Sequence, residues 1–194
     1  MKKKNKIDII NPINQLNLYG FQNYFLQFVT LYKKKVLPNI ILLSGEKGIG
    51  KATFSYHFIN YLLSEKEKYS YSTDKFKINS ENFSYKLVNN STHPNFFLLD
   101  SVSLGESIKI DQARSLLKFL NQTNSLNNLK VILIDNADLL NINSSNSLLK
   151  SIEEPSINTF FFIIDNNSSS LLDTIKSRSL KFKFHFNLIE KKYI

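Results

Sequence analysis

The chain has 194 residues, of which 42% are hydrophobic and 21% are charged, proportions that fit one globular domain with a sizeable core. It contains no cysteine, which excludes a disulfide framework and any thiolate metal site. The net charge of +9 is spread along the whole chain, which makes it a weak argument for nucleic-acid binding. No apolar stretch approaches the roughly 18 residues of a membrane-spanning helix, so we expect a cytoplasmic protein without a membrane partner.

The first part of the chain predicts a helix, a strand and a second helix. Residues 1–16 are polar and basic and are expected to form an extended arm. Apolar residues at spacings of three and four predict an amphipathic helix over residues 18–32. The short apolar run 40–43 is typical of a buried strand, and residues 51–63 again have helical spacing.

The second part continues this alternation after an irregular segment. Residues 64–93 have no clear periodicity, which indicates a long insertion or a mobile loop. Strands are then expected at residues 96–99, 131–134, 160–164 and 180–186, with helices at residues 111–120 (Asp111 as the cap), 144–153 and 171–175. Strands that alternate with helices are typical of a parallel sheet covered on both faces. The expected fold class is therefore α/β, with a five-stranded parallel sheet between helices.

The segment from Gly45 to Lys51 fits a phosphate-binding loop. It reads Gly-Glu-Lys-Gly-Ile-Gly-Lys, which matches G-x-x-x-x-G-K, and it stands between a predicted strand and a predicted helix, as the motif requires. The glycines at Gly45, Gly48 and Gly50 let backbone N–H groups converge on phosphate oxygens. The helix N-terminus and the Lys51 ammonium add positive charge. The segment therefore predicts a nucleotide phosphate site, with ATP as the candidate ligand.

Two parts of a hydrolysing site are missing. The last position of the motif, where a hydroxyl would hold Mg²⁺, is Ala52, and Thr53 comes one residue later, about 100° further around the helix. Asp135 ends an apolar run, where a carboxylate would bind Mg²⁺. The next residue is Asn136, whose amide cannot act as a base toward water. We therefore expect weak or vestigial ATP binding, poor hydrolysis and no firm metal site.

Several segments, in the right order, resemble the delta prime family of bacterial DNA polymerase III, which belongs to the AAA+ clamp-loader proteins. The resemblance covers residues 18–184. The glycine-rich loop alone is not specific, whereas the run 146–155, followed by Ser177-Arg178, is highly specific to clamp loaders. The matching segments also include His93-Pro94-Asn95, Ile110-Asp111-Gln112-Ala113-Arg114 and Val131 to Asp138.

The resemblance implies a RecA-like AAA+ module that acts in DNA replication. A clamp loader uses ATP to open the sliding clamp and load it onto primed DNA. The implied partners are the motor and delta subunits, the clamp and, through the assembly, primer–template DNA. The implied subunit does not hydrolyse ATP itself, and it is part of a DNA-directed DNA polymerase holoenzyme instead of an enzyme on its own.

The resemblance also implies roles for two single residues. Arg178 would reach the ATP of a neighbouring subunit as an arginine finger, and Asn166 would stand at the sensor position after the fourth strand. Arg178 is one of only two arginines among 25 cationic residues. Because lysine cannot replace arginine at a forked or stacked contact, this scarcity agrees with a special role.

The chain departs from the family pattern in two places. Residues 64–93 stand where many relatives carry a four-cysteine zinc module, so zinc is not expected. The expected AAA+ domain covers residues 17–186, and residues 187–194 would only begin the lid and collar region. Two other functions stay open: a catalytically active P-loop ATPase or kinase, favoured by Lys51 and Asp135, and a basic DNA-binding module, favoured by the net charge.

Overall fold

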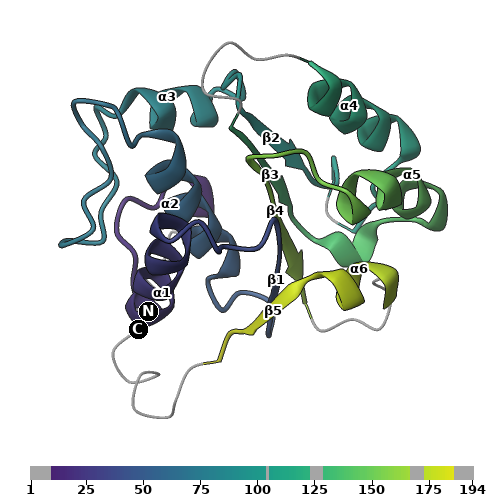
Figure 1. The fold of residues 1–194 in the computed structure, drawn as a ribbon, viewed down its shortest axis with the longest axis horizontal. Coiled ribbons are helices and arrows are strands. Elements are labelled where there is room, and N and C mark those ends of the chain that lie inside the picture. The colour runs from purple at the N-terminus through teal and green to yellow at the C-terminus, as the bar shows by residue number, and fades with distance from the viewer. Residues whose placement is uncertain (1–9, 104, 123–128, 167–172, 186–194) are drawn as a thin grey trace, which may run out of the picture.

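The computed structural model describes residues 10–103, 105–122, 129–166 and 173–185 (Figure 1). Five parallel strands form one sheet, in the spatial order β2 (Phe96–Leu99), β3 (Lys130–Ile134), β4 (Thr159–Asp165), β1 (Ile40–Ser44) and β5 (Leu180–Lys183). Every residue of β1, β3 and β4 is buried, as expected for central strands of a sheet covered on both faces. The predicted five-stranded parallel sheet is therefore confirmed.

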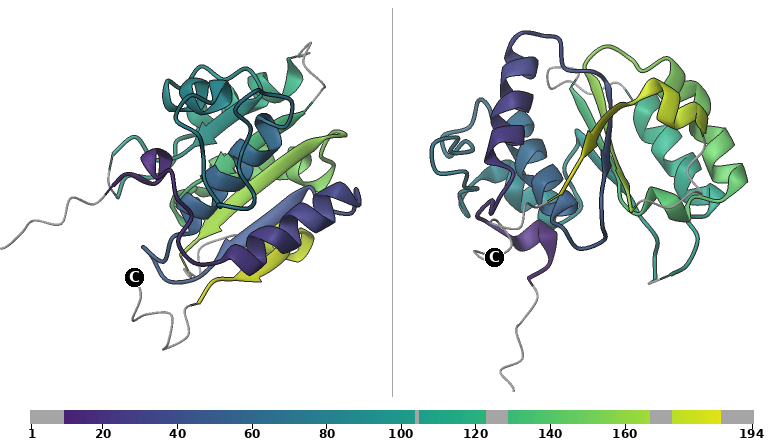
Figure 2. Two further views of the ribbon diagram at one scale, coloured as in Figure 1. Left: turned by 90° about the vertical axis from the view of Figure 1, so that its left-hand side faces the viewer. Right: turned by 90° about the horizontal axis from the view of Figure 1, so that it is seen from below.

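Helices cover both faces of this sheet, as the view from below shows (Figure 2). One face carries α1 (Gln22–Lys33), α2 (Lys51–Leu63) and α3 (Phe83–Asn89), and the other carries α4 (Ile110–Asn121), α5 (Ile142–Glu153) and α6 (Asp173–Arg178). Two 3-10 turns, η1 (Pro12–Asn14) and η2 (Ala137–Leu139), complete the described elements. Each face has its own apolar core, and nine phenylalanines are among the described buried residues of the core under α1 and α2.

The sheet brings three polar segments to one edge. Parallel strands all end at the same edge, and Ser44 at the end of β1 is paired in register with Asp165 at the end of β4. Asp135 follows β3. This strand is hydrogen-bonded to the side of β4 that faces away from β1. The glycine-rich loop, Asp135 and Asn166 are thereby placed at this carboxyl edge.

Residues 64–93 are folded, so of the two expected alternatives, a long insertion or a mobile loop, the mobile loop is wrong. They contain α3 and an antiparallel bridge between Ser72 and Lys77. Tyr71 is buried, its ring stacks on Phe25 at a centroid distance of 4.9 Å, and its hydroxyl lies 2.9 Å from His57 Nδ1. A few isolated side chains enter the core between polar residues, and this leaves no helical or strand period in the sequence.

The segment before α1 also differs from the expected arm. Residues 12–16 include η1, and the carbonyl oxygen of Leu16 accepts a hydrogen bond of 2.9 Å from the backbone N–H of Ile78. The predicted helix begins at Gln22 and not at Leu18, because Phe21 has a φ of 59°, outside the helical region. Residues 1–9 lie outside the described part of the chain.

Three other boundaries are adjusted. Asp111 is not the cap of α4. The Gln112 side chain accepts a hydrogen bond from the backbone N–H of Lys109, and Asp111 instead forms an ion pair with Arg114 in solvent. The helix expected at residues 171–175 is seen as α6 from Asp173 onward, with the two positions before it outside the described residues. The strand expected at residues 180–186 ends at Lys183, and Phe186 and residues 187–194 lie outside the described part of the chain. Among the described residues, no helix is long and apolar enough to cross a membrane.

Candidate functional site

The glycine-rich loop connects β1 to α2, as its motif predicts. Gly45 has a φ of 153°, and a Cβ atom there would lie 2.6 Å from the carbonyl oxygen of Phe184, so no other residue fits without a shift. Gly50 precedes α2 with a φ of 102°, a conformation that favours glycine. Close backbone packing therefore explains Gly45, and left-handed backbone conformations explain Gly50 and Gly48, which has a φ of 83° and lies on the open side of the loop.

Lys51, the first residue of α2, points back onto this loop. Its side chain is buried, and Nζ donates hydrogen bonds of 2.7 Å to the Gly45 carbonyl and 2.8 Å to the Glu46 carbonyl. Burial lowers the pKa of Lys51, while the carboxylates at the same edge, led by Asp135, act in the opposite direction. The ammonium therefore lies where it can meet a phosphate group, but two carbonyl oxygens hold it at present.

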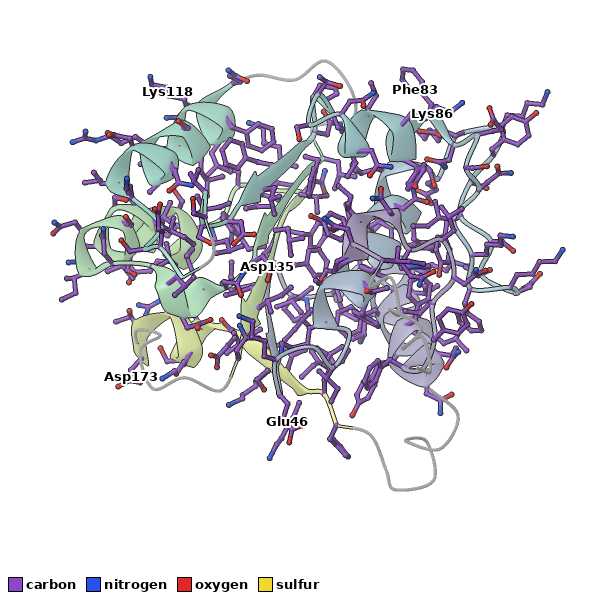
Figure 3. All side chains as sticks on the ribbon, turned by 180° about the vertical axis from the view of Figure 1, so that it is seen from behind. Glu46, Phe83, Lys86, Lys118, Asp135 and Asp173 are labelled. Atoms are coloured by element: carbon purple, nitrogen blue, oxygen red, sulfur yellow. The ribbon has the colours of Figure 1, made fainter. Side chains whose placement is uncertain are left out.

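Asp135 lies near the middle of the molecule, whereas Glu46 of the glycine-rich loop lies at its edge (Figure 3). Burial and the nearby Asp100 carboxylate raise the pKa of Asp135 to about 6, although a hydrogen bond of 2.8 Å from the Asn136 backbone N–H works against this. Asp135 therefore exchanges its proton close to neutral pH. A bound cation would hold it in the charged form.

The Asn136 side chain links residues that follow neighbouring strands at this edge of the sheet. Its Nδ2 donates to Asp100 at 3.0 Å, and its Oδ1 accepts from Asn166 Nδ2 at 3.3 Å. Asn166 also donates to Asp138 at 3.2 Å. Sequence reasoning missed Asp100 and Asp138. The signal for Asp100 was available, because it follows the apolar run of β2 just as Asp135 follows β3.

A cavity of about 350 Å³ opens between these groups. Its walls include Lys47, Gly48, Gly50, Lys51, Asp135, Asn136 and Asn166, together with Ile10 and Pro12 from the start of the described chain. Thr53 also lines the cavity, beside Ala52, although its position on the helix suggested another direction. The cavity thus combines backbone donors at a helix N-terminus with a lysine, which are the groups that bind phosphate. Among the described residues, no group of three or more histidine or carboxylate side chains is arranged for a metal ion.

Arg178 lies apart from this cavity. It is the last residue of α6, and it is not among the described residues that line the cavity. Its Nη2 lies 3.3 Å from Glu153 Oε1, its Nη1 lies 3.5 Å from the Thr174 carbonyl oxygen, and 45% of its side chain is exposed. The structure therefore joins two of the family-like segments, the helix that ends at Glu153 and the Ser177-Arg178 end of α6. It leaves Arg178 open to a neighbouring molecule.

Solved structures with the same architecture identify the fold. A DNA polymerase III gamma subunit-related protein from Thermotoga maritima matches with a TM-score of 0.59 and 21% identity, over 86% of this chain and 48% of its own. The Holliday junction branch migration motor RuvB of the same organism matches with a TM-score of 0.52 and 15% identity, over 93% of this chain and 51% of its own. The fold is that of a RecA-like AAA+ module, as the sequence predicted.

Sequence comparison then gives the family. The family model described as "DNA polymerase III, delta subunit" matches residues 21–187, and the chain belongs to this family. The delta prime subunit of Pseudomonas aeruginosa is 36% identical over 140 residues, which are 72% of this chain and 41% of that protein. The Escherichia coli delta prime subunit is 27% identical over 79% of this chain and 44% of its own length. The chain thus spans about two-fifths of the length of these curated relatives.

Proposed function

We propose that this chain is a delta prime subunit of the bacterial clamp loader and helps to load the sliding clamp onto primed DNA during replication. Its partners are then the motor and delta subunits, the clamp and, through the assembly, primer–template DNA. The observation that carries the proposal is the family match over residues 21–187, within which Arg178 stands exposed at the end of α6.

In this role the chain does not hydrolyse ATP itself. Asn136 stands where a base would orient water, and its amide is engaged with Asp100 and Asn166. Lys51 must leave two carbonyl acceptors before it can meet a phosphate, which disfavours tight nucleotide binding. ATP is therefore a weak or vestigial ligand of this chain, held by Gly45, Gly48, Gly50 and Lys51 if it binds.

Arg178 acts on a neighbour in the proposed assembly. An arginine finger places its planar cation against the transferring phosphoryl group, where charge develops in the transition state. Arg178 lies outside the cavity of its own chain, so a single copy cannot complete such a site with it. A head-to-tail contact, in which different surfaces of two subunits meet, supplies the missing half.

A second candidate is a catalytically active P-loop ATPase, which Thr53 favours by lining the cavity with a hydroxyl. The two candidates differ in the turnover of the isolated chain. For a delta prime subunit we expect no ATP hydrolysis by the chain alone and stable association with the motor and delta subunits in sedimentation. A turnover of about 1 s⁻¹ by the chain alone would favour the ATPase, and the absence of association would contradict the proposed function.

A further inference from the structure

We propose that Glu153 positions Arg178 for its action on the neighbouring subunit. This inference rests on the proposed function, because it assigns a second residue to the same finger. Glu153 would not touch the nucleotide. It would hold the guanidinium of Arg178 in the direction from which a phosphoryl oxygen can meet it.

The geometry of the guanidinium carries the first step. A guanidinium has five N–H donors in a fixed plane. Two nitrogens of Arg178 contact acceptors on the chain's own helices. Nη2 lies 3.3 Å from Glu153, and Nη1 donates to the Thr174 carbonyl at 3.5 Å. These contacts use two donors and leave three for another acceptor. Glu153 can therefore keep its contact while Arg178 binds a phosphoryl oxygen of a neighbour.

The second step is the rigidity of the element that carries Glu153. It is the last residue of α5, and the helix is anchored one residue earlier by Ile152, which is 1% exposed, and by the fully buried Leu148. The next backbone N–H, of Glu154, still donates to the Lys150 carbonyl at 3.0 Å. A carboxylate on such a fixed helix end orients a flexible arginine better than one on a loop would.

The third step excludes a mainly structural role for the pair. The side chains of Arg178 and Glu153 are 45% and 37% exposed, and ion pairs in this setting contribute little to folding. A comparable surface ion pair lies on α6, the short helix that carries Arg178. It joins Lys176 to Asp173 at 3.4 Å, and the Asp173 side chain is 99% exposed. Among the described interactions, no hydrogen bond or ion pair joins Lys176 or Asp173 to Arg178, so this second pair provides a matched control.

The test uses a loader assembled from the full chain with its motor and delta subunits, and its readout is DNA-stimulated ATP hydrolysis. With Glu153→Ala we expect kcat to fall roughly tenfold while KM stays the same, because a misdirected guanidinium weakens the transition state and not ATP binding. Glu153→Gln should restore most of the rate, since its amide oxygen still accepts from Nη2. The control Asp173→Asn should leave kcat unchanged.

Two further measurements separate positioning from a structural effect. In the Arg178→Ala background, Glu153→Ala should cause no additional loss of kcat, because the residue acts only through Arg178. The Tm of the Glu153→Ala chain should stay within about 4 °C of the unchanged chain, as expected for an exposed pair. An unchanged or raised kcat in Glu153→Ala, or an additional loss in the double variant, would overturn the inference. If Arg178→Ala itself leaves kcat unchanged, it is the proposed finger that fails.

Discussion

At the scale of single residues, burial and close approach decide the properties of individual side chains. His57 is fully buried in α2 between two segments, with Nδ1 at 2.9 Å from the Tyr71 hydroxyl and Nε2 at 2.9 Å from the Gln15 carbonyl. Its burial lowers its pKa to about 4, and the pKa of His93 is lowered to about 4 for the same reason. Both rings are therefore neutral in the folded chain at pH values where the unfolded chain protonates them.

This difference predicts acid sensitivity. Between about pH 6.5 and 4 the unfolded chain binds more protons on His57 and His93 than the folded chain does, so stability falls as pH falls through this window. Asp135, with its pKa raised to about 6, has the opposite effect. We expect the urea midpoint to drop from pH 7 to pH 4.5, and to drop more steeply in Asp135→Asn. A midpoint that is flat or rises on acidification would contradict the burial of the two histidines.

The glycine-rich loop gives a second prediction at this scale. Gly45→Ala should destabilise the chain by about 2 kcal/mol or more, because the new Cβ would lie 2.6 Å from the backbone oxygen of Phe184. Gly48→Ala is the matched control, since its Cβ would meet nothing within 4 Å and only the positive φ of 83° opposes it, at about 1 kcal/mol. Urea unfolding measures both. Equal losses in the two variants would contradict the close approach at Gly45.

At the scale of elements, the sequence was sufficient where periodicity was strong. Burial of both strand faces sets the apolar runs that became β1, β3 and β4. Burial against the sheet sets the helical spacing of α2 and α5. Both kinds of burial are visible in the sequence pattern. Residues 64–93 were not predictable, because their fold depends on single long-range contacts. The pairing of Glu153 with Arg178 was hidden for the same reason, since 25 positions separate the two residues in the sequence.

The order of this segment can be tested with two tyrosines. Tyr71→Ala should destabilise the chain by about 3 kcal/mol, because it removes a buried ring stacked on Phe25 and the hydroxyl beside His57. Tyr69→Ala is the control, since 43% of Tyr69 is exposed, and it should cost less than about 1 kcal/mol. Thermal or urea unfolding gives both values. If Tyr71→Ala costs no more than Tyr69→Ala, the segment is not packed as described.

At the scale of the whole molecule, the two groups of residues that the proposed function assigns to ATP sites are separated. The glycine-rich loop, Lys51 and Asn136 border one cavity, whereas Arg178 lies at the end of α6, outside it. The first group could be predicted from the sequence because its residues follow strands and turns in a fixed order. The position of Arg178 outside this cavity was expected only from the family resemblance and could not be derived from the residues themselves, since it depends on how α6 packs beside α5. Such an arrangement suits a subunit that completes the site of another subunit.

The most direct test of this account is the ATP hydrolysis of an assembled loader with Arg178→Ala in this chain. We expect the kcat of the loader to fall by about 10³-fold, in line with the removal of an arginine finger. Arg178→Lys should rescue little, because a point charge cannot replace a planar fork. Binding of the chain to the other subunits should persist, since its fold does not depend on this half-exposed side chain. An intact assembly with unchanged ATP hydrolysis would contradict the account.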